Sequence, residues 1–121
     1  MRIIFYGDSI TDMVRSRDVD YMAFGYGVGY VNYVASTLMG EEPEKYDILN
    51  RGVSGNRIVD LYARIKADVW NLNPDVISVL IGINDVWHEI DAKNGVDVER
   101  FEKVYRMLIE DTLKRFPKVR F

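Results

Sequence analysis

Two short apolar runs constrain the fold of this chain more than any other feature of its sequence. Arg2–Tyr6 is rich in β-branched and aromatic residues, and Val76–Ile83 is apolar at almost every position. A strand with one face in solvent alternates apolar and polar residues, whereas a continuous apolar run is typical of a strand buried on both faces. The two runs therefore predict a parallel sheet that is covered by helices on both sides.

The segments around these runs have the residue spacing of amphipathic helices. Apolar residues recur every three to four positions, and a proline follows each segment within a few residues. The predicted helices span Tyr30–Met39, Asn56–Leu72 and Val98–Phe116. Strands that alternate with helices imply right-handed crossovers, so we expect residues 1–121 to form a single three-layer α/β/α domain.

Three further segments complete this outline. Tyr46–Leu49 predicts a second strand, Trp87–Gly95 predicts a loop, and Val119–Phe121 could open a fourth strand. A strand as apolar as Val76–Ile83 needs a neighbour on each side, and a long unpaired apolar edge invites pairing with another chain. We therefore expect either the amino-terminal part of a larger domain, which is incomplete at its carboxyl end, or a homo-oligomer formed through the exposed sheet edge.

Composition excludes several classes of protein. The chain has 121 residues, of which 48% are apolar and 29% charged, as in one small globular domain. Its net charge of −3 with scattered basic residues does not favour binding to nucleic acid or to an anionic membrane surface. The absence of cysteine excludes disulfides, thiolate metal sites and a cysteine nucleophile. A cytoplasmic location is the default expectation, and a secreted form stays open.

Small and polar residues follow each predicted strand, where a parallel sheet gathers them at one edge. The three loops contain Gly7-Asp8-Ser9, then Asn50 to Asn56, then Gly82-Ile83-Asn84-Asp85. Ser9 is a candidate nucleophile, and ester hydrolysis passes through a tetrahedral oxyanion that fixed hydrogen-bond donors must stabilise. The backbone N–H groups of Ser9 and Gly55 and the side-chain amide of Asn84 are three such donors. The sequence therefore predicts an acyl-transfer site at this edge.

These loops resemble three of the four signature blocks of the SGNH (GDSL-type) hydrolases, in the family's order. The longer stretches Ile3–Thr11, Gly27–Val34, Asn50–Leu61 and Pro74–Trp87 look like the carbohydrate-esterase side of that family, which includes acetyl-xylan-esterase-like members. The resemblance implies a flavodoxin-like sheet of strand order 2-1-3-4-5 and hydrolysis of small acyl esters, plausibly O-acetyl groups on carbohydrate, without a metal or cofactor.

The resemblance also implies roles for individual residues. It makes Ser9 the nucleophile and first oxyanion donor, Gly55 the second donor and Asn84 the third. Asp8 and Asp85, which adjoin two of these residues, are expected to support the site.

The family's fourth block, an aspartate three residues before a histidine, has no counterpart in this sequence. That pair supplies the orienting acid and the general base, and a serine hydroxyl is a poor nucleophile without a base. We therefore predict little or no esterase activity from this chain alone. His88, the only histidine, could substitute for the base, but the resemblance places the base on a different segment, and a surface or rim histidine is the favoured interpretation.

Alternative interpretations of the same residues stay open. Ser9 could cap a helix, and Asp8 could accept hydrogen bonds from its own loop. Trp87 could stack on a sugar ring and Arg57 could hold a polar substrate group, or both could only pack. Two other functions remain: a non-catalytic domain that binds acylated sugars or is completed by another chain, and a flavodoxin-like phosphate or nucleotide binder.

Two ligand sites are disfavoured by the sequence. Gly25, Gly27 and Gly29 do not follow a strand directly and lack the lysine of a phosphate-binding loop, so conformational freedom explains them better. Asp8, Asp12 and Asp85 invite comparison with a magnesium site, but their spacing gives no dedicated cage.

Overall fold

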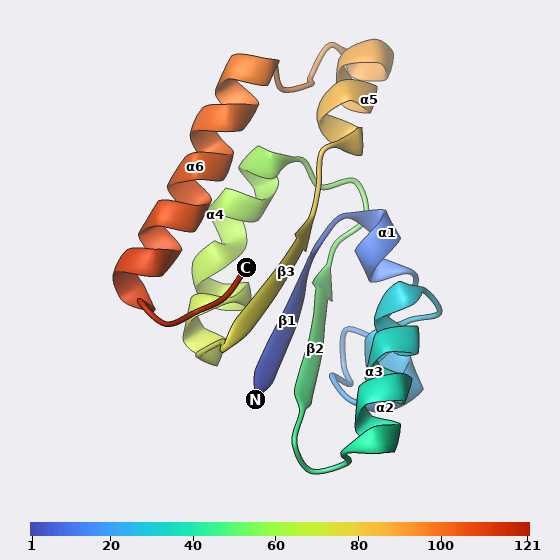
Figure 1. Cartoon of the computed structure of the whole chain (residues 1–121). Coiled ribbons are helices and arrows are strands. Elements are labelled where there is room, and N and C mark those ends of the chain that lie inside the picture. The colour runs from blue at the N-terminus through green and yellow to red at the C-terminus, as the bar shows by residue number, and fades with distance from the viewer.

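A parallel sheet of three strands forms the centre of the computed structural model, which describes all 121 residues (Figure 1). The strands are β1 (Arg2–Gly7), β2 (Asp47–Gly52) and β3 (Val76–Leu80), in the order β2-β1-β3. The register pairs Gly7 with both Gly52 and Leu80, so all three strands end at one edge. This is the start of the flavodoxin-like order expected from the sequence.

Helices cover both faces of the sheet (Figure 1). On one face lie α2 (Met22–Tyr26) and α3 (Tyr30–Glu41), and on the other lie α4 (Ile58–Asp68) and α6 (Val98–Arg115). Residues of β1 alternate between the two cores, because successive side chains of a strand point to opposite faces. The three-layer α/β/α architecture predicted from the apolar runs is therefore confirmed. None of the helices combines the length and the apolar character that crossing a membrane would require.

Two helices begin at the carboxyl edge of the sheet, α1 (Ser9–Asp12) after β1 and α5 (Ile83–Ala92) after β3. Close packing holds α1 against the end of β2, because a Cβ atom on Gly52 would lie 2.2 Å from the backbone nitrogen of Asp12. The buried amide of Asn50 strengthens this contact, since its Nδ2 donates to the carbonyl of Thr11 at 2.7 Å. These contacts fix the position of Ser9.

The loop predicted for Trp87–Gly95 is wrong, because α5 continues to Ala92 and only the following residues form a loop. The strand predicted for Val76–Ile83 likewise ends at Leu80. Both differences come from Gly82, whose φ of 137° turns the chain sharply from strand to helix.

Other predicted bounds also move. Asn50, Arg51 and Gly52 belong to β2 rather than to a closing loop, because they pair with the last residues of β1. The predicted helix Asn56–Leu72 is divided into α4 and the 3₁₀ turn η1 (Trp70–Leu72), since the backbone leaves helical geometry at Val69. α3 extends to Glu41, past its predicted end at Met39.

One edge of β3 is open. The sequence predicts an interior strand here, but β3 pairs along its length only with β1. On its other side a single parallel bridge joins Val76 to Arg120, where the Ile77 N–H donates to the Arg120 carbonyl at 2.9 Å. The chain therefore does place Val119–Phe121 where a fourth strand would begin.

Candidate active site

The three predicted site residues lie on segments that the sheet brings to one edge, where α1 and α5 begin (Figure 1). Hydrogen bonds join these segments in sequence. The Val53 N–H donates to the Gly7 carbonyl at 3.0 Å, which links the Gly55 loop to the end of β1. The side-chain Nδ2 of Asn84 donates to the Asn56 carbonyl at 3.0 Å, which links α5 to the same loop.

Ser9 is the first residue of α1, and it is exposed. The preceding Asp8 is buried, and its Oδ1 accepts a hydrogen bond from the Ile10 N–H at 3.0 Å. Asp8 therefore caps α1 with a hydrogen bond within its own loop, of the kind considered for Asp8 from the sequence. The backbone N–H of Ser9 has no acceptor within the chain. Both the hydroxyl and the N–H of Ser9 are thus available at the edge.

Gly55 has a φ of +83°, a conformation that favours glycine, and no atom lies within 4 Å of the position that a Cβ atom would occupy. Its place is therefore set by the backbone rather than by crowding, and the space beside it is open. The Gly55 N–H makes no hydrogen bond within the chain. Such an unpaired donor is what a developing oxyanion requires.

Asn84 lies in the first turn of α5, and its bond to the Asn56 carbonyl uses only one of its two amide hydrogens. The second hydrogen remains available, so each of the three predicted oxyanion donors keeps a free N–H. The neighbouring Asp85 is buried, and its Oδ1 accepts from the Ile58 N–H at 2.9 Å. This hydrogen bond joins the start of α4 to α5. Burial raises the pKa of the Asp85 carboxyl group.

Arg57 is occupied by contacts within the chain. Its Nε donates to Asp60 Oδ2 at 2.9 Å, and its Nη1 donates to the Asn94 carbonyl at 2.8 Å. These bonds fix the start of α4 and the loop after α5. A role for Arg57 in holding substrate stays a prediction, and it would require the guanidinium to give up one of these partners.

Trp87 and His88 follow Asn84 by three and four residues, so they lie one helical turn further along the same side of α5. Trp87 is exposed, and its role against a sugar stays a prediction. The imidazole of His88 forms no hydrogen bond with Ser9 or with any other residue. The position of His88 thus agrees with a rim histidine.

Asp12 was not predicted as part of the site, yet it connects α1 to the Gly55 loop. Its buried carboxylate accepts from the backbone N–H and the hydroxyl of Ser54, both at 3.0 Å, and from Arg17 at 2.6 Å. Burial alone would raise its pKa, but the hydrogen bonds from Arg17 and Ser54 outweigh burial and lower the pKa to about 2. Asp12 thereby holds the residue next to Gly55.

Arg64 on α4 is a second residue that sequence reasoning missed. Its guanidinium donates to the carbonyls of Gly7 at 3.1 Å and Arg51 at 2.9 Å, and to Asn56 Oδ1 at 2.7 Å. These three acceptors lie at the end of β1, at the end of β2 and next to Gly55. No local signal marks Arg64, since an arginine on the polar side of an amphipathic helix is ordinary.

The three aspartates considered as magnesium ligands do not meet. Asp8 accepts from its own helix, Asp12 binds Arg17 and Ser54, and Asp85 accepts from Ile58. The structure contains no group of three acidic, histidine or cysteine side chains placed to hold a metal ion.

The fold and the arrangement of Ser9, Gly55 and Asn84 define a three-layer α/β domain of the SGNH hydrolase type. Residues 5–121 match the GDSL-like Lipase/Acylhydrolase family, and the chain belongs to that family.

Individual relatives agree with this family. An acetylxylan esterase of Geobacillus stearothermophilus is 40% identical over 117 residues, which are 92% of this chain and 53% of the relative. A solved GDSL-like lipase of Parabacteroides merdae superposes with a TM-score of 0.92 at 37% identity, over 98% of this chain and 56% of that one. A structure of Axe2, an acetyl xylan esterase of G. stearothermophilus, superposes with a TM-score of 0.87 at 38% identity. The match covers 98% of this chain and 56% of that one. The chain thus spans about half the length of these relatives.

Proposed function

We propose that this chain carries the nucleophile and the oxyanion donors of a serine esterase that hydrolyses small acyl esters, with O-acetyl groups on carbohydrate as its substrates. One observation carries the proposal: the N–H groups of Ser9 and Gly55 have no partner within the chain and lie at the same sheet edge as the Ser9 hydroxyl and the Asn84 amide. The likeness to a protein named acetylxylan esterase supports the choice of acyl group and alcohol.

In this mechanism the Ser9 Oγ attacks the ester carbonyl, and the carbonyl oxygen becomes an anion that accepts from Ser9 N–H, Gly55 N–H and Asn84 Nδ2. A general base takes the proton from Oγ and returns it to the leaving alcohol, after which water releases the acyl group from Ser9. Solved catalytic mutants of Axe2 replace a serine, an aspartate or a histidine by alanine. We propose that Ser9 corresponds to that serine and that an aspartate–histidine pair outside this sequence supplies the base.

A fusion tests the assignment directly. The chain is joined to the part of the acetylxylan esterase that it does not match, and release of acetate is measured with 4-nitrophenyl acetate and with acetylated xylooligosaccharides. We expect activity that Ser9→Ala reduces by about 10⁶-fold and Asn84→Ala by about 10²–10³-fold. Ser36→Ala, a serine on the exposed side of α3, is the control and leaves the rate unchanged. An active Ser9→Ala fusion would contradict the proposal.

The chain by itself is expected to hydrolyse 4-nitrophenyl acetate little faster than buffer, because no base contacts Ser9. His88→Ala leaves this residual rate unchanged, since the imidazole of His88 makes no bond to Ser9. A rate near that of a full-length relative would refute the missing-base argument. A large loss in His88→Ala would make His88 the base.

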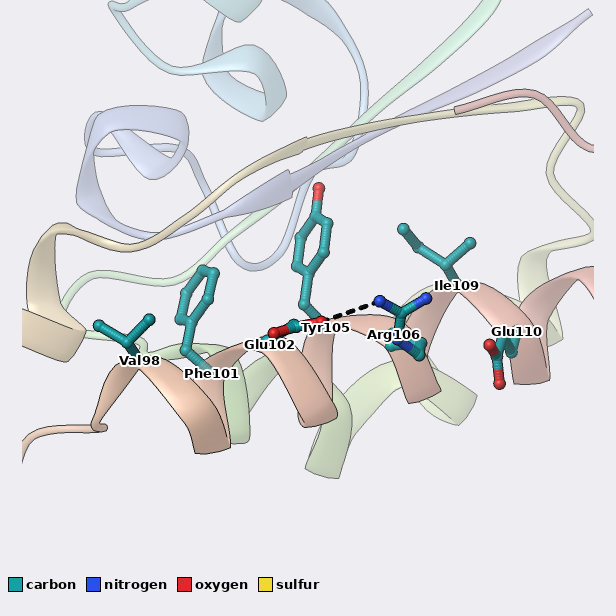
Figure 2. Close-up of a pocket in the computed structure, with 7 residues that line it drawn as sticks. All are labelled: Val98, Phe101, Glu102, Tyr105, Arg106, Ile109 and Glu110. Carbon is teal, nitrogen blue, oxygen red and sulfur yellow. Dashed lines mark hydrogen bonds and ion pairs between the residues drawn. The ribbon is translucent and has the colours of Figure 1, made fainter.

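We also propose that a second copy of the chain covers the open side of β3 when the chain is isolated. Val98, Phe101, Tyr105 and Ile109 of α6 point toward β3 and line a cavity of about 540 Å³ (Figure 2). An apolar surface beside an unpaired strand edge favours association between chains. The cytoplasmic location expected from the sequence stays a prediction.

A further inference from the structure

A second pocket lies beside the proposed acyl site, at the end of β2, and arginines dominate its lining. It has a volume of about 260 Å³ and is lined by Arg15, Arg17, Asp20, Arg51, Ala67 and Asp68. Three arginines around one pocket are notable in a chain whose net charge is −3. Nothing in the proposed hydrolysis uses this pocket.

One of these three arginines has no carboxylate partner. Arg17 pairs with Asp12 at 2.6 Å, Arg51 pairs with Asp20 at 2.5 Å, and Arg64 on the adjacent helix pairs with Asp68 at 2.6 Å. Each aspartate in and around the pocket therefore has its own arginine. Arg15 forms no ion pair with any carboxylate, so the pocket and its immediate neighbours carry one positive charge in excess.

The contacts of Arg15 hold its guanidinium in place but leave most of its donors unused. Its Nε donates to the Gly52 carbonyl at 2.8 Å, and its Nη1 donates to the Ser16 carbonyl at 3.3 Å. Nη2 and the second hydrogen of Nη1 have no acceptor within the chain. Burial, together with the neighbouring charges of Arg17 and Arg51, lowers the pKa of Arg15.

We propose that this pocket binds a small oxyanion, a carboxylate or a phosphate group, through the free N–H groups of Arg15. A guanidinium whose Nη hydrogens are free can bind two oxygens of such a group at once. The site stands independently of hydrolysis, because it uses no residue of the acyl site.

The position of the pocket suggests how the ligand relates to the proposed reaction. Arg15 is held on Gly52, three residues before Gly55, and Arg17 shares the Asp12 carboxylate with Ser54. If the proposed esterase function holds, one ligand that reaches both places is an acylated sugar with an acidic group. A carboxylate of an acidic sugar and a phosphate ester have the same recognition chemistry, and experiment separates them.

Titration with inorganic phosphate, D-glucuronate and neutral D-xylose at constant ionic strength tests the site, with ¹⁵N–¹H spectra of the 121-residue chain as the readout. We expect phosphate or glucuronate to shift the signals of Arg15, Gly52 and their neighbours saturably, and xylose to leave them in place. Arg15→Gln should weaken binding by roughly fivefold or more, since one unpaired charge is lost. Lys118→Gln, which removes one exposed charge at the opposite end of the sheet, is the matched control and should bind as before.

A variant that is expected to bind more tightly is a second test, because poor folding could weaken binding but would not strengthen it. Asp20→Asn removes the carboxylate that pairs with Arg51, so it raises the excess charge of the pocket from one to two. We expect it to bind phosphate roughly threefold or more tightly. Phosphate bound more tightly than glucuronate indicates a phosphate ester as ligand, and the reverse order indicates an acidic sugar.

Three results would overturn the site. These are shifts that do not saturate with either anion, an affinity that Arg15→Gln leaves unchanged while its spectrum shows a folded chain, and an Asp20→Asn variant that binds no better than the unaltered chain.

Discussion

Asp12 is a single residue on which the acyl site depends, although it touches no proposed reacting atom. Its carboxylate lies 3.0 Å from both the backbone N–H and the hydroxyl of Ser54. Because Ser54 precedes Gly55, these bonds restrict the direction in which the Gly55 N–H can point. Asp12 belongs to α1, the helix that also carries Ser9, so α1 sets the orientation of the Gly55 N–H.

The acid stability of the chain should report on Asp12. Its pKa is lowered from 3.8 in an ordinary aspartate to about 2 in the folded chain, so the unfolded chain binds the proton more tightly. The stabilisation is therefore complete above about pH 4 and disappears as the pH falls through about 2. We expect Asp12→Asn to lower the free energy of unfolding by about 1.5–3 kcal/mol at pH 6, and this difference should shrink towards pH 2.

Urea unfolding at a series of pH values measures this effect. Asp18→Asn, at an exposed position a few residues later, is the control and should run parallel to the unaltered chain. A difference between Asp12→Asn and the unaltered chain that stays constant from pH 6 to pH 2 would contradict the linkage.

Among single residues, the positions of those with a local signal could be predicted from the sequence, whereas their roles stay predictions. Ser9, Gly55 and Asn84 each follow a strand in a recognisable block, and the structure places all three at one edge. Asp12 and Arg64 could not be predicted, because their importance arises from distant partners. Asp12 binds Ser54, more than forty residues away, and Arg64 binds the Gly7 carbonyl, more than fifty residues away. Contacts of this kind leave no periodic pattern in the sequence.

At the scale of elements, α5 shows both the strength and the failure of sequence reasoning. Ile83, Val86 and Ile90 have helical spacing, but the sequence is interpreted as a strand up to Ile83 and a loop from Trp87. In the structure these apolar residues are exposed, and the buried residue of α5 is Asp85. Sequence reasoning identifies a helix by an apolar side that packs into the core, and α5 has its apolar side in solvent. β1 was predicted more reliably, because its apolar residues are buried between two layers of helices.

The contact between α4 and α5 depends on Asp85. Its replacement by alanine leaves the Ile58 N–H buried without its acceptor, so we expect Asp85→Ala to lower the free energy of unfolding by about 1–3 kcal/mol. Chemical denaturation measures this loss. Asp91→Ala, an exposed aspartate on the same helix, should change stability little, and equal effects of the two variants would argue against the role given to Asp85.

At the scale of the whole molecule, the two sides of the sheet are unequal. β1 is covered on both faces and paired on both edges, whereas β2 and β3 each have one free edge, and the free edge of β3 lies beside the exposed apolar residues of α5 and α6. Val98 joins the two exposed surfaces, since it lines the cavity on α6 and another of about 530 Å³ that includes Val86 and Ile90. This is the side of the molecule that we propose a second copy covers.

Sedimentation of the isolated chain at increasing concentration tests that expectation. We expect reversible self-association, and Val98→Glu should shift the population to monomer, because Val98 is exposed and a buried carboxylate would oppose the contact. Tyr33→Glu, at an equally exposed position on α3, should associate like the unaltered chain. A chain that stays monomeric at every concentration would rule out pairing through this side.

The guanidinium of Arg64 joins the ends of β1 and β2 to the loop that carries Gly55, and it does so from the middle of α4. Fraying of α4 would release all three segments at once, while the hydrogen bonds between the strands stayed intact. On warming, the chain should therefore lose its ability to capture ligands at this rim before it loses its β-structure.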